Sequence, residues 1–157
     1  MIKILIYQTW AYEIDSDHSG FLKYDRNQLK MHQAIDAVYE SLSKRMHLEV
    51  IPCGKVIAKL RTYPEFDYTN GGISLCRDGF HMNLIYSRFA LASTWFETLL
   101  KHSVIDNSFL PAHRDDETIL NKTELDRLDF NKVGPDLLRL IKKVVHELTN
   151  KNSGFKC

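Results

Sequence analysis

The chain has 157 residues, of which 44% are hydrophobic and 26% are charged, so it is long enough for one globular domain with a real core. Its formal net charge of +1 and its lack of a bilayer-length apolar run give no reason to expect a nucleic acid or a membrane as a partner. Two features predict a cytoplasmic protein: the cysteines are odd in number and widely spaced (Cys53, Cys76 and Cys157), and the first residues, MIKILIYQ, lack the long apolar core of a signal peptide. This expectation would change if a leader was lost with an N-terminal half.

The first 52 residues have the pattern of one parallel βαβ unit. Ile2–Tyr7 is rich in β-branched and aromatic residues, which predicts a strand buried on both faces whose edge needs a partner. A helix is expected from about Arg26 to Met46 with Asp25 as its N-cap, and a second strand from Leu48 to Pro52. The apolar stripe expected to be buried on this helix comprises Met31, Ile35, Val38, Leu42 and Met46.

Polar and aromatic side chains follow the first strand at its carboxyl end, where ligand crevices form in open α/β sheets. We predict that Gln8, Trp10 and Tyr12 bind substrate, with the two rings as an aromatic wall. The alternative is that one or both rings only cover the end of the sheet. The segment Glu13–Tyr24 is polar and is expected to be a solvated loop.

The middle of the chain leads from the second strand to a polar turn. A short helix is expected at Lys55–Leu60, and Arg61–Leu75 is a turn-rich loop in which proline and paired glycines forbid a long helix. The turn that follows carries Asp78 and His81, three residues apart. At this spacing the carboxylate can accept a hydrogen bond from the imidazole, which would fix the tautomer and leave the other ring nitrogen as a general base.

The turn runs directly into an apolar helix within Cys76–Leu100, for which Asn83 is a plausible N-cap. The residues expected on its buried face, from their three- and four-residue steps, are Phe89, Ala92, Trp95, Phe96 and Leu99. Such a helix would anchor the turn at the surface. The Asp-x-x-His spacing alone is weak evidence, because Asp15 and His18 repeat it without an apolar anchor.

The C-terminal third changes in character. Ser103–Thr118 is expected to be a loop, Glu117–Leu128 a short helix and Lys151–Cys157 a disordered tail. The clearest helix opens at Pro135, and the residues predicted on its apolar face are Leu137, Leu138, Ile141, Val144, Val145 and Leu148. This face fits a packing helix, with an oligomer interface as the alternative.

The segments Gln8-Thr9-Trp10-Ala11-Tyr12 and Arg77-Asp78-Gly79-Phe80-His81 occur in the order found in a bacterial branch of the SGNH (GDSL-like) hydrolases. The chain resembles the C-terminal part of that superfamily from about residue 2 to residue 100. The resemblance implies acyl-ester hydrolysis, often on carbohydrates or lipids, with His81 as base and Asp78 as the group that stabilises the imidazolium. Ser87 departs from the pattern, because a glycine is expected there.

The larger departure is the lack of a Gly-Asp-Ser or Gly-Asn-Ser block, which carries the nucleophile in that superfamily, and of the blocks that supply its oxyanion hole. Ser74 and Ser87 do not lie at a strand-to-helix elbow that would expose a hydroxyl, and Cys76 beside the turn is a slightly better candidate. A metal site made of Asp78, His81 and His18 lacks any motif with metal-ligand spacing.

The sequence thus predicts an α/β protein, an incomplete three-layer α/β/α (flavodoxin-like SGNH) domain with parallel strands over residues 1–102, and a helical extension over residues 103–150. We expect an SGNH-type ester hydrolase represented by its Asp/His-bearing part and inactive alone, with no cofactor and no metal. Two alternatives stay open: a non-catalytic binding module, or half of a split enzyme completed by a partner chain. The expected partners are a small-molecule or carbohydrate ester and either a missing N-terminal half or a second copy of the chain.

Overall fold

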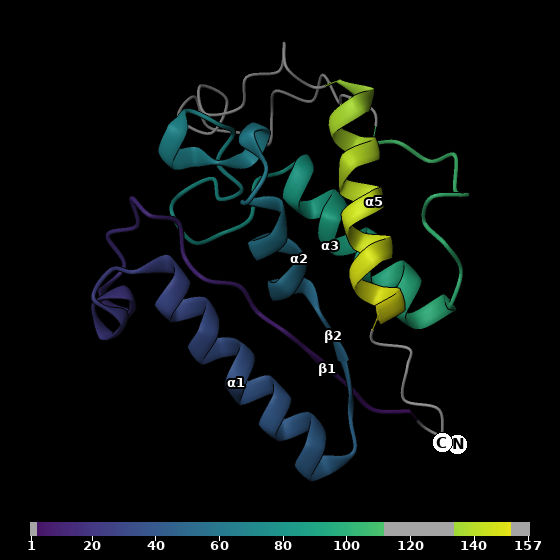
Figure 1. Ribbon diagram of the computed structural model, residues 1–157, viewed down its shortest axis with the longest axis horizontal. Coiled ribbons are helices and arrows are strands. Elements are labelled where there is room, and N and C mark those ends of the chain that lie inside the picture. Colours follow the sequence, from purple (N-terminus) through teal and green to yellow (C-terminus); the bar gives the residue numbers. More distant parts are fainter. Residues whose placement is uncertain (1–2, 112–133, 152–157) are drawn as a thin grey trace.

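Two short parallel strands form the centre of the fold (Figure 1). In the computed structural model, which describes residues 3–111 and 134–151, β1 (Leu5–Tyr7) pairs with β2 (Glu49–Ile51), and Leu5 lies opposite Glu49. The helix α1 (Gln28–Met46) makes the crossover between them, so the predicted parallel βαβ unit is confirmed. In Figure 1, α1 lies on one side of the strands and α2, α3 and α5 lie on the other, which makes this an incomplete α/β domain with a C-terminal helix.

The prediction that the first strand is buried on both faces is wrong. All three residues of β1 are only half-buried, and Ile4 just before it is 65% exposed. The reason is that, within the described residues, the sheet has two strands and β1 pairs along one edge only. Residues 3–111 and 134–151 therefore pair no strand with its other edge and bury its side chains only in part.

The start of α1 differs from the prediction. Asn27 is the N-cap, and its side chain accepts a hydrogen bond from the Lys30 amide at 2.8 Å. Asp25 instead ends the preceding 3-10 helix η1 (Ser19–Tyr24), with a left-handed φ of 56°. Arg26 also has a positive φ of 53°, so the helix can begin only after these two residues.

The expected stripe of α1 is buried in part only. Met31 is buried and Ile35 packs against its cluster, whereas Val38 and Met46 are 55% and 59% exposed. Because α1 lies over a sheet of two strands in the described part of the chain, its apolar face is larger than the surface it covers.

The main hydrophobic core lies among α2 (Cys53–Leu60), α3 (Tyr86–Leu100) and α5 (Pro135–Lys151). The predicted apolar face of α5 is confirmed, with Leu138, Ile141, Val144 and Val145 buried and the remaining two residues packed against the core. This face contacts α3 and α2. The helix α2 begins at Cys53, two residues earlier than predicted.

The prediction for the buried face of α3 is wrong in most positions. Phe89 is buried, but Trp95 and Leu99 are 38% and 47% exposed. The face that packs inward instead combines two aromatic rings with small or polar side chains: it comprises Tyr86, Ser87, Phe89, Ala90, Ser93, Thr94, Glu97 and Thr98. The carboxylate of Glu97 provides the physical reason, because it accepts hydrogen bonds from His146 and Thr149 of α5 and draws this face against that helix.

Two 3-10 turns, η2 (Pro64–Phe66) and η3 (Tyr68–Asn70), occupy the loop expected at residues 61–75. The short helix predicted at residues 117–128 lies outside the described residues. Of the disordered tail predicted at residues 151–157, Lys151 is instead the last residue of α5, and residues 152–157 lie outside the described residues. In the part of the chain that is described, no helix is both long enough and apolar enough to span a membrane.

Candidate functional site

A short hairpin presents the Asp78–His81 turn. Cys76 and Met82 pair across its base in an antiparallel bridge, and the Arg77 amide donates to the carbonyl oxygen of His81 at 2.8 Å. The chain reverses at Gly79, whose φ of 87° lies in the region that only glycine adopts without strain. The turn is therefore closed by backbone geometry before its side chains are considered.

Within the turn, Asp78 and His81 make the hydrogen bond that their spacing predicts. Nδ1 of His81 lies 2.7 Å from Oδ2 of Asp78, while Oδ1 of Asp78 accepts from the backbone amides of His81 at 2.8 Å and Phe80 at 3.3 Å. The side chain of His81 is 55% exposed, and that of Asp78 is 41% exposed. The other ring nitrogen of His81, Nε2, makes no hydrogen bond with any described residue.

The carboxyl group of Asp78 is held in its ionised form. Partial burial raises its pKa, but the hydrogen bonds from the His81 side chain and from the two backbone amides lower it further, and the net pKa is below its usual value. An ionised Asp78 favours the His81 tautomer with its proton on Nδ1. Nε2 then carries a free lone pair, which is what a general base requires.

The three residues predicted to bind substrate have different surroundings. Gln8 is fully buried: its amide nitrogen donates to Asp36 at 2.9 Å, and its amide oxygen accepts from the Lys55 amide at 3.0 Å in the first turn of α2. Half-buried Trp10 donates from Nε1 to the carbonyl oxygen of Phe80 at 2.8 Å. The ring of Tyr12, also half-buried, lies 5.9 Å from that of Phe80. The two aromatic residues thus border the turn, whereas the buried amide of Gln8 bonds to α1 and α2.

The segment that was expected to be a solvated loop in fact packs against the turn. The Glu13 amide donates to the carbonyl oxygen of Gly79 at 2.7 Å, and Phe21 is fully buried. The imidazole of His18 lies 4.9 Å from the ring of Tyr12 and 5.1 Å from that of Phe80, and its Nδ1 accepts from the Gly20 amide. The prediction of a solvated loop is therefore wrong, because apolar and backbone contacts hold this segment to the hairpin.

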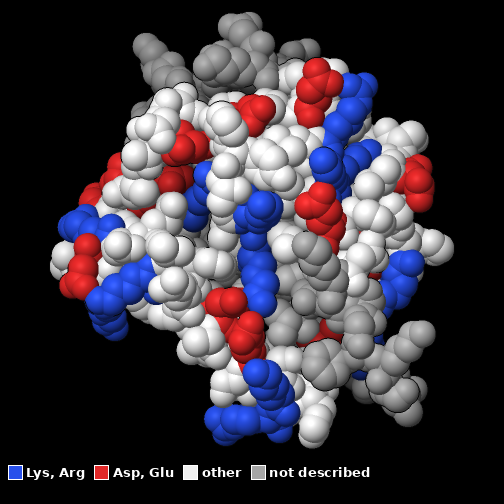
Figure 2. Space-filling model, in the orientation of Figure 1, with Lys and Arg blue, Asp and Glu red and all other residues white. Residues whose placement is uncertain are grey.

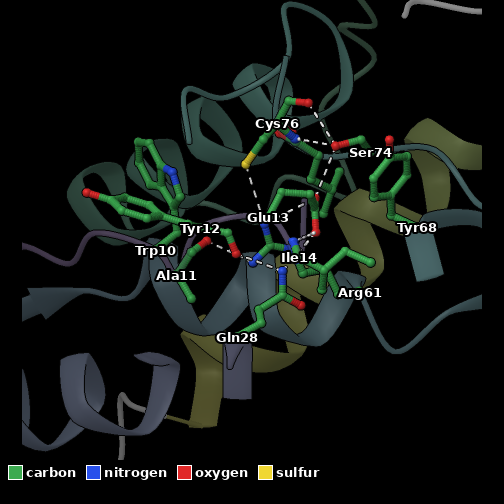
Figure 3. A network of polar contacts seen from close by, with 12 residues as sticks. Trp10, Ala11, Tyr12, Glu13, Ile14, Gln28, Arg61, Tyr68, Ser74 and Cys76 are labelled. Atoms are coloured by element: carbon green, nitrogen blue, oxygen red, sulfur yellow. Dashed lines mark hydrogen bonds and ion pairs between the residues drawn. The ribbon is translucent and has the colours of Figure 1, made fainter. Parts of the chain in front are cut away.

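Behind the hairpin lies a buried polar network that the sequence interpretation missed (Figure 3). Its centre is an ion pair between Arg61 and Glu13, 3.3 Å apart, whose side chains are 9% and 2% exposed. Gln28 of α1 donates to Glu13 at 2.8 Å, and Ser74 donates to it at 3.1 Å. The pair is separated by 48 positions in the chain, so a single sequence gives no signal that joins the two residues.

The candidate nucleophiles are all engaged in structural contacts. Ser74 donates to Glu13 and to the carbonyl oxygen of Cys76, and Ser87 is fully buried and donates to the carbonyl oxygen of Leu75 at 2.6 Å. Burial raises the pKa of the Cys76 thiol to about 12, so the thiolate is scarce at neutral pH. No hydrogen bond joins any of the three to the His81 ring in the described structure.

Metal ligation receives no support from the geometry: the described residues contain no group of three or more His, Cys, Asp or Glu side chains arranged to hold a metal ion. The charges at the surface are mixed, and Figure 2 shows acidic and basic side chains interspersed over the face in view. The candidate site is thus a turn bordered by aromatic rings, which carries the ionised carboxylate of Asp78 and the imidazole of His81, whose Nε2 bonds to no described residue.

Residues 1–124 match the model of a domain of unknown function, DUF4886. The chain is also similar to a solved structure of a DUF4886 family protein from Bacteroides uniformis, with 26% sequence identity and a TM-score of 0.69. The similarity covers 92% of this chain but 47% of that one, so this chain spans about half the length of its structural relative. No curated protein matches the sequence.

Proposed function

Since the chain belongs to the DUF4886 family, a domain of unknown function, we propose from its own site that it supplies the acid–base pair of an SGNH-type ester hydrolase. In this proposal His81 takes a proton from a serine hydroxyl through Nε2, and Asp78 stabilises the imidazolium that forms. The observation that carries the proposal is the 2.7 Å contact of Nδ1 with the Asp78 carboxylate, combined with a His81 side chain that is 55% exposed and whose Nε2 makes no hydrogen bond with a described residue.

The serine and the oxyanion donors come, in this proposal, from outside the residues described here. The three local candidates are occupied or buried, and the structural relative is about twice as long as this chain. The edge of β1 that no described strand pairs supports the same view, because a half-buried strand with such an edge can accept a further parallel strand. Either a longer form of the chain or a partner chain would provide these parts.

The substrate that we propose is an acyl ester, with carbohydrate esters as one class. Trp10 and Tyr12 border the turn from the carboxyl end of β1 and would contact the substrate beside His81. Gln8 would act indirectly, because both ends of its buried amide are already bonded and hold the strand end to α1 and α2. A non-catalytic binding module is the second candidate, and it is favoured by the structural contacts that hold Ser74, Ser87 and Cys76.

Complementation tests the proposal. We expect the purified chain to hydrolyse p-nitrophenyl acetate no faster than its His81→Ala variant. Adding the half of the Bacteroides uniformis protein that this chain does not match should produce turnover that His81→Ala abolishes. Turnover by the mixture that is equal for both forms would contradict the role of His81, and His81-dependent turnover by the chain alone would contradict an external nucleophile.

A further inference from the structure

We propose that Glu13 and Arg61 are positioning residues whose buried ion pair sets the orientation of the Asp78–His81 turn. This inference deepens the proposed function and rests on it only for the catalytic purpose of the turn. The evidence is the network around the pair, which joins the exit of β1 to the base of the hairpin (Figure 3), together with the backbone bond from Glu13 to Gly79 at the tip of the turn.

The guanidinium of Arg61 connects three segments at once. Nη1 donates to the carbonyl oxygen of Ala11 at 2.9 Å, and Nη2 contacts the Glu13 carboxylate at 3.3 Å and the Cys76 sulfur at 3.4 Å. Arg61 itself is the C-cap of α2, the helix at the centre of the main core. The exit of β1 and the base of the hairpin are thus both tied to one rigid helix end.

Glu13 completes the connection from the other side. Its carboxylate accepts from Ser74, which also bonds both the amide and the carbonyl oxygen of Cys76 at the hairpin base. Its backbone amide donates to Gly79 at the tip of the turn, at 2.7 Å. One residue therefore contacts the hairpin at its base through the side chain and at its tip through the backbone.

The desolvation of the Glu13–Arg61 pair indicates that it contributes to the geometry of the network rather than to the stability of the fold. Both side chains are removed from water, and Arg61 Nε is buried with no partner among the described residues. A buried pair with incomplete hydrogen bonding recovers little of its desolvation cost, and apolar replacements of similar size are often equally stable. What apolar side chains cannot supply is the set of directional bonds to Ala11, Ser74 and Cys76.

The test uses the described chain and needs no substrate. The ring nitrogens of His81 report the tautomer in ¹⁵N-detected NMR spectra, and the wild type should show the proton on Nδ1. In the double variant Glu13→Leu/Arg61→Met we expect near-unchanged thermal stability. The ratio of the Nδ1–H to the Nε2–H tautomer of His81 should fall about tenfold, because the preference for Nδ1–H depends on the charge-assisted hydrogen bond to Asp78 being held in place.

The matched control is Glu97→Gln, which weakens another buried carboxylate, in the α3–α5 contact, away from the turn. It should lower the thermal midpoint and leave the His81 signals unchanged. If the double variant does not fold, Glu13→Gln is measured in the same way, since it leaves Arg61 without its counter-charge.

Wild-type His81 signals in a folded double or single variant would overturn the proposal. Failure of both variants to fold would also overturn it, because the pair would then serve the fold as a whole. If the His81 signals respond as expected while the ester assays show no His81-dependent turnover, the proposed function fails and the positioning role stands.

Discussion

Replacing Asp78 by Asn isolates the contribution of one carboxylate to the state of His81. The side-chain oxygen of Asn can still accept from the backbone amides that Asp78 bonds, at 2.8 Å and 3.3 Å, so the turn should keep its shape. The side-chain nitrogen cannot accept from Nδ1 of His81. We therefore expect the proton of the neutral ring to move to Nε2, which removes the lone pair that a base needs.

The cost in stability should be small even though the change in tautomer is complete. Both side chains are about half exposed, and an ion pair or charged hydrogen bond in that setting is worth at most about 1 kcal/mol, or about 2–4 °C in the melting temperature of a chain of this size. In a completed hydrolase the same change should lower turnover by about 10⁴-fold, the scale seen when a catalytic histidine is held in the wrong tautomer.

The pH dependence of this stabilisation has a definite sign. Because the pKa of Asp78 is lowered in the folded state, its contribution is fully present above the unfolded value of about 3.9 and is lost as the pH falls through the lower, folded value. Wild type and Asp78→Asn should therefore differ in urea unfolding at pH 6 and converge below about pH 3.

The matched control is Asp15→Asn, at the other Asp-x-x-His spacing. Asp15 accepts from the Tyr68 hydroxyl at 3.1 Å and makes no bond with His18 in the described structure. The Asp15→Asn substitution should leave the ¹⁵N signals of His18 and His81 unchanged. Signals of His81 that are identical in the wild type and in Asp78→Asn would refute the reasoning, since the carboxylate would then have no control of the tautomer.

Three further predictions concern other parts of the fold. Asn27→Ala should lower the free energy of unfolding by about 1 kcal/mol through loss of the α1 cap, and Asp25→Ala by less than half of that; denaturant titration distinguishes the two candidate caps. Gly54→Ala should cost about 3 kcal/mol, because its Cβ would lie 2.0 Å from the Thr9 carbonyl oxygen, and a normal melting curve would contradict this. Cys76, with its thiol pKa raised to about 12, should resist Ellman's reagent at pH 8 until the chain is unfolded, as peptide mapping of the labelled sites would show.

The local features of the fold could be read from the sequence, and the features that depend on distant contacts could not. The βαβ unit, the apolar face of α5 and the Asp78–His81 hydrogen bond follow from short-range patterns, and all are present. The buried face of α3 does not follow, because the inward Thr94 bonds to Ala90 in its own helix and the inward Glu97 bonds to Val104 and to His146 of α5, which apolar periodicity does not detect.

The candidate site also combines features that short-range sequence patterns predict with features that depend on distant contacts. The turn could be predicted because both functional groups lie within four residues, whereas the Glu13–Arg61 pair and the packing of His18 on Phe80 require the folded chain. The binding of substrate by Trp10 and Tyr12, the domain division at residue 102 and the cytoplasmic location stay predictions.

The most direct measurement of the central claim is an ester-hydrolysis assay on the intact DUF4886 protein of Bacteroides uniformis, with alanine at the residue that aligns with His81. The account predicts turnover of acyl esters by the unaltered protein and a loss of at least about 10³-fold in the variant, with folding unchanged. Equal turnover in the two forms, or no hydrolysis of any ester in a broad acyl panel, would contradict it.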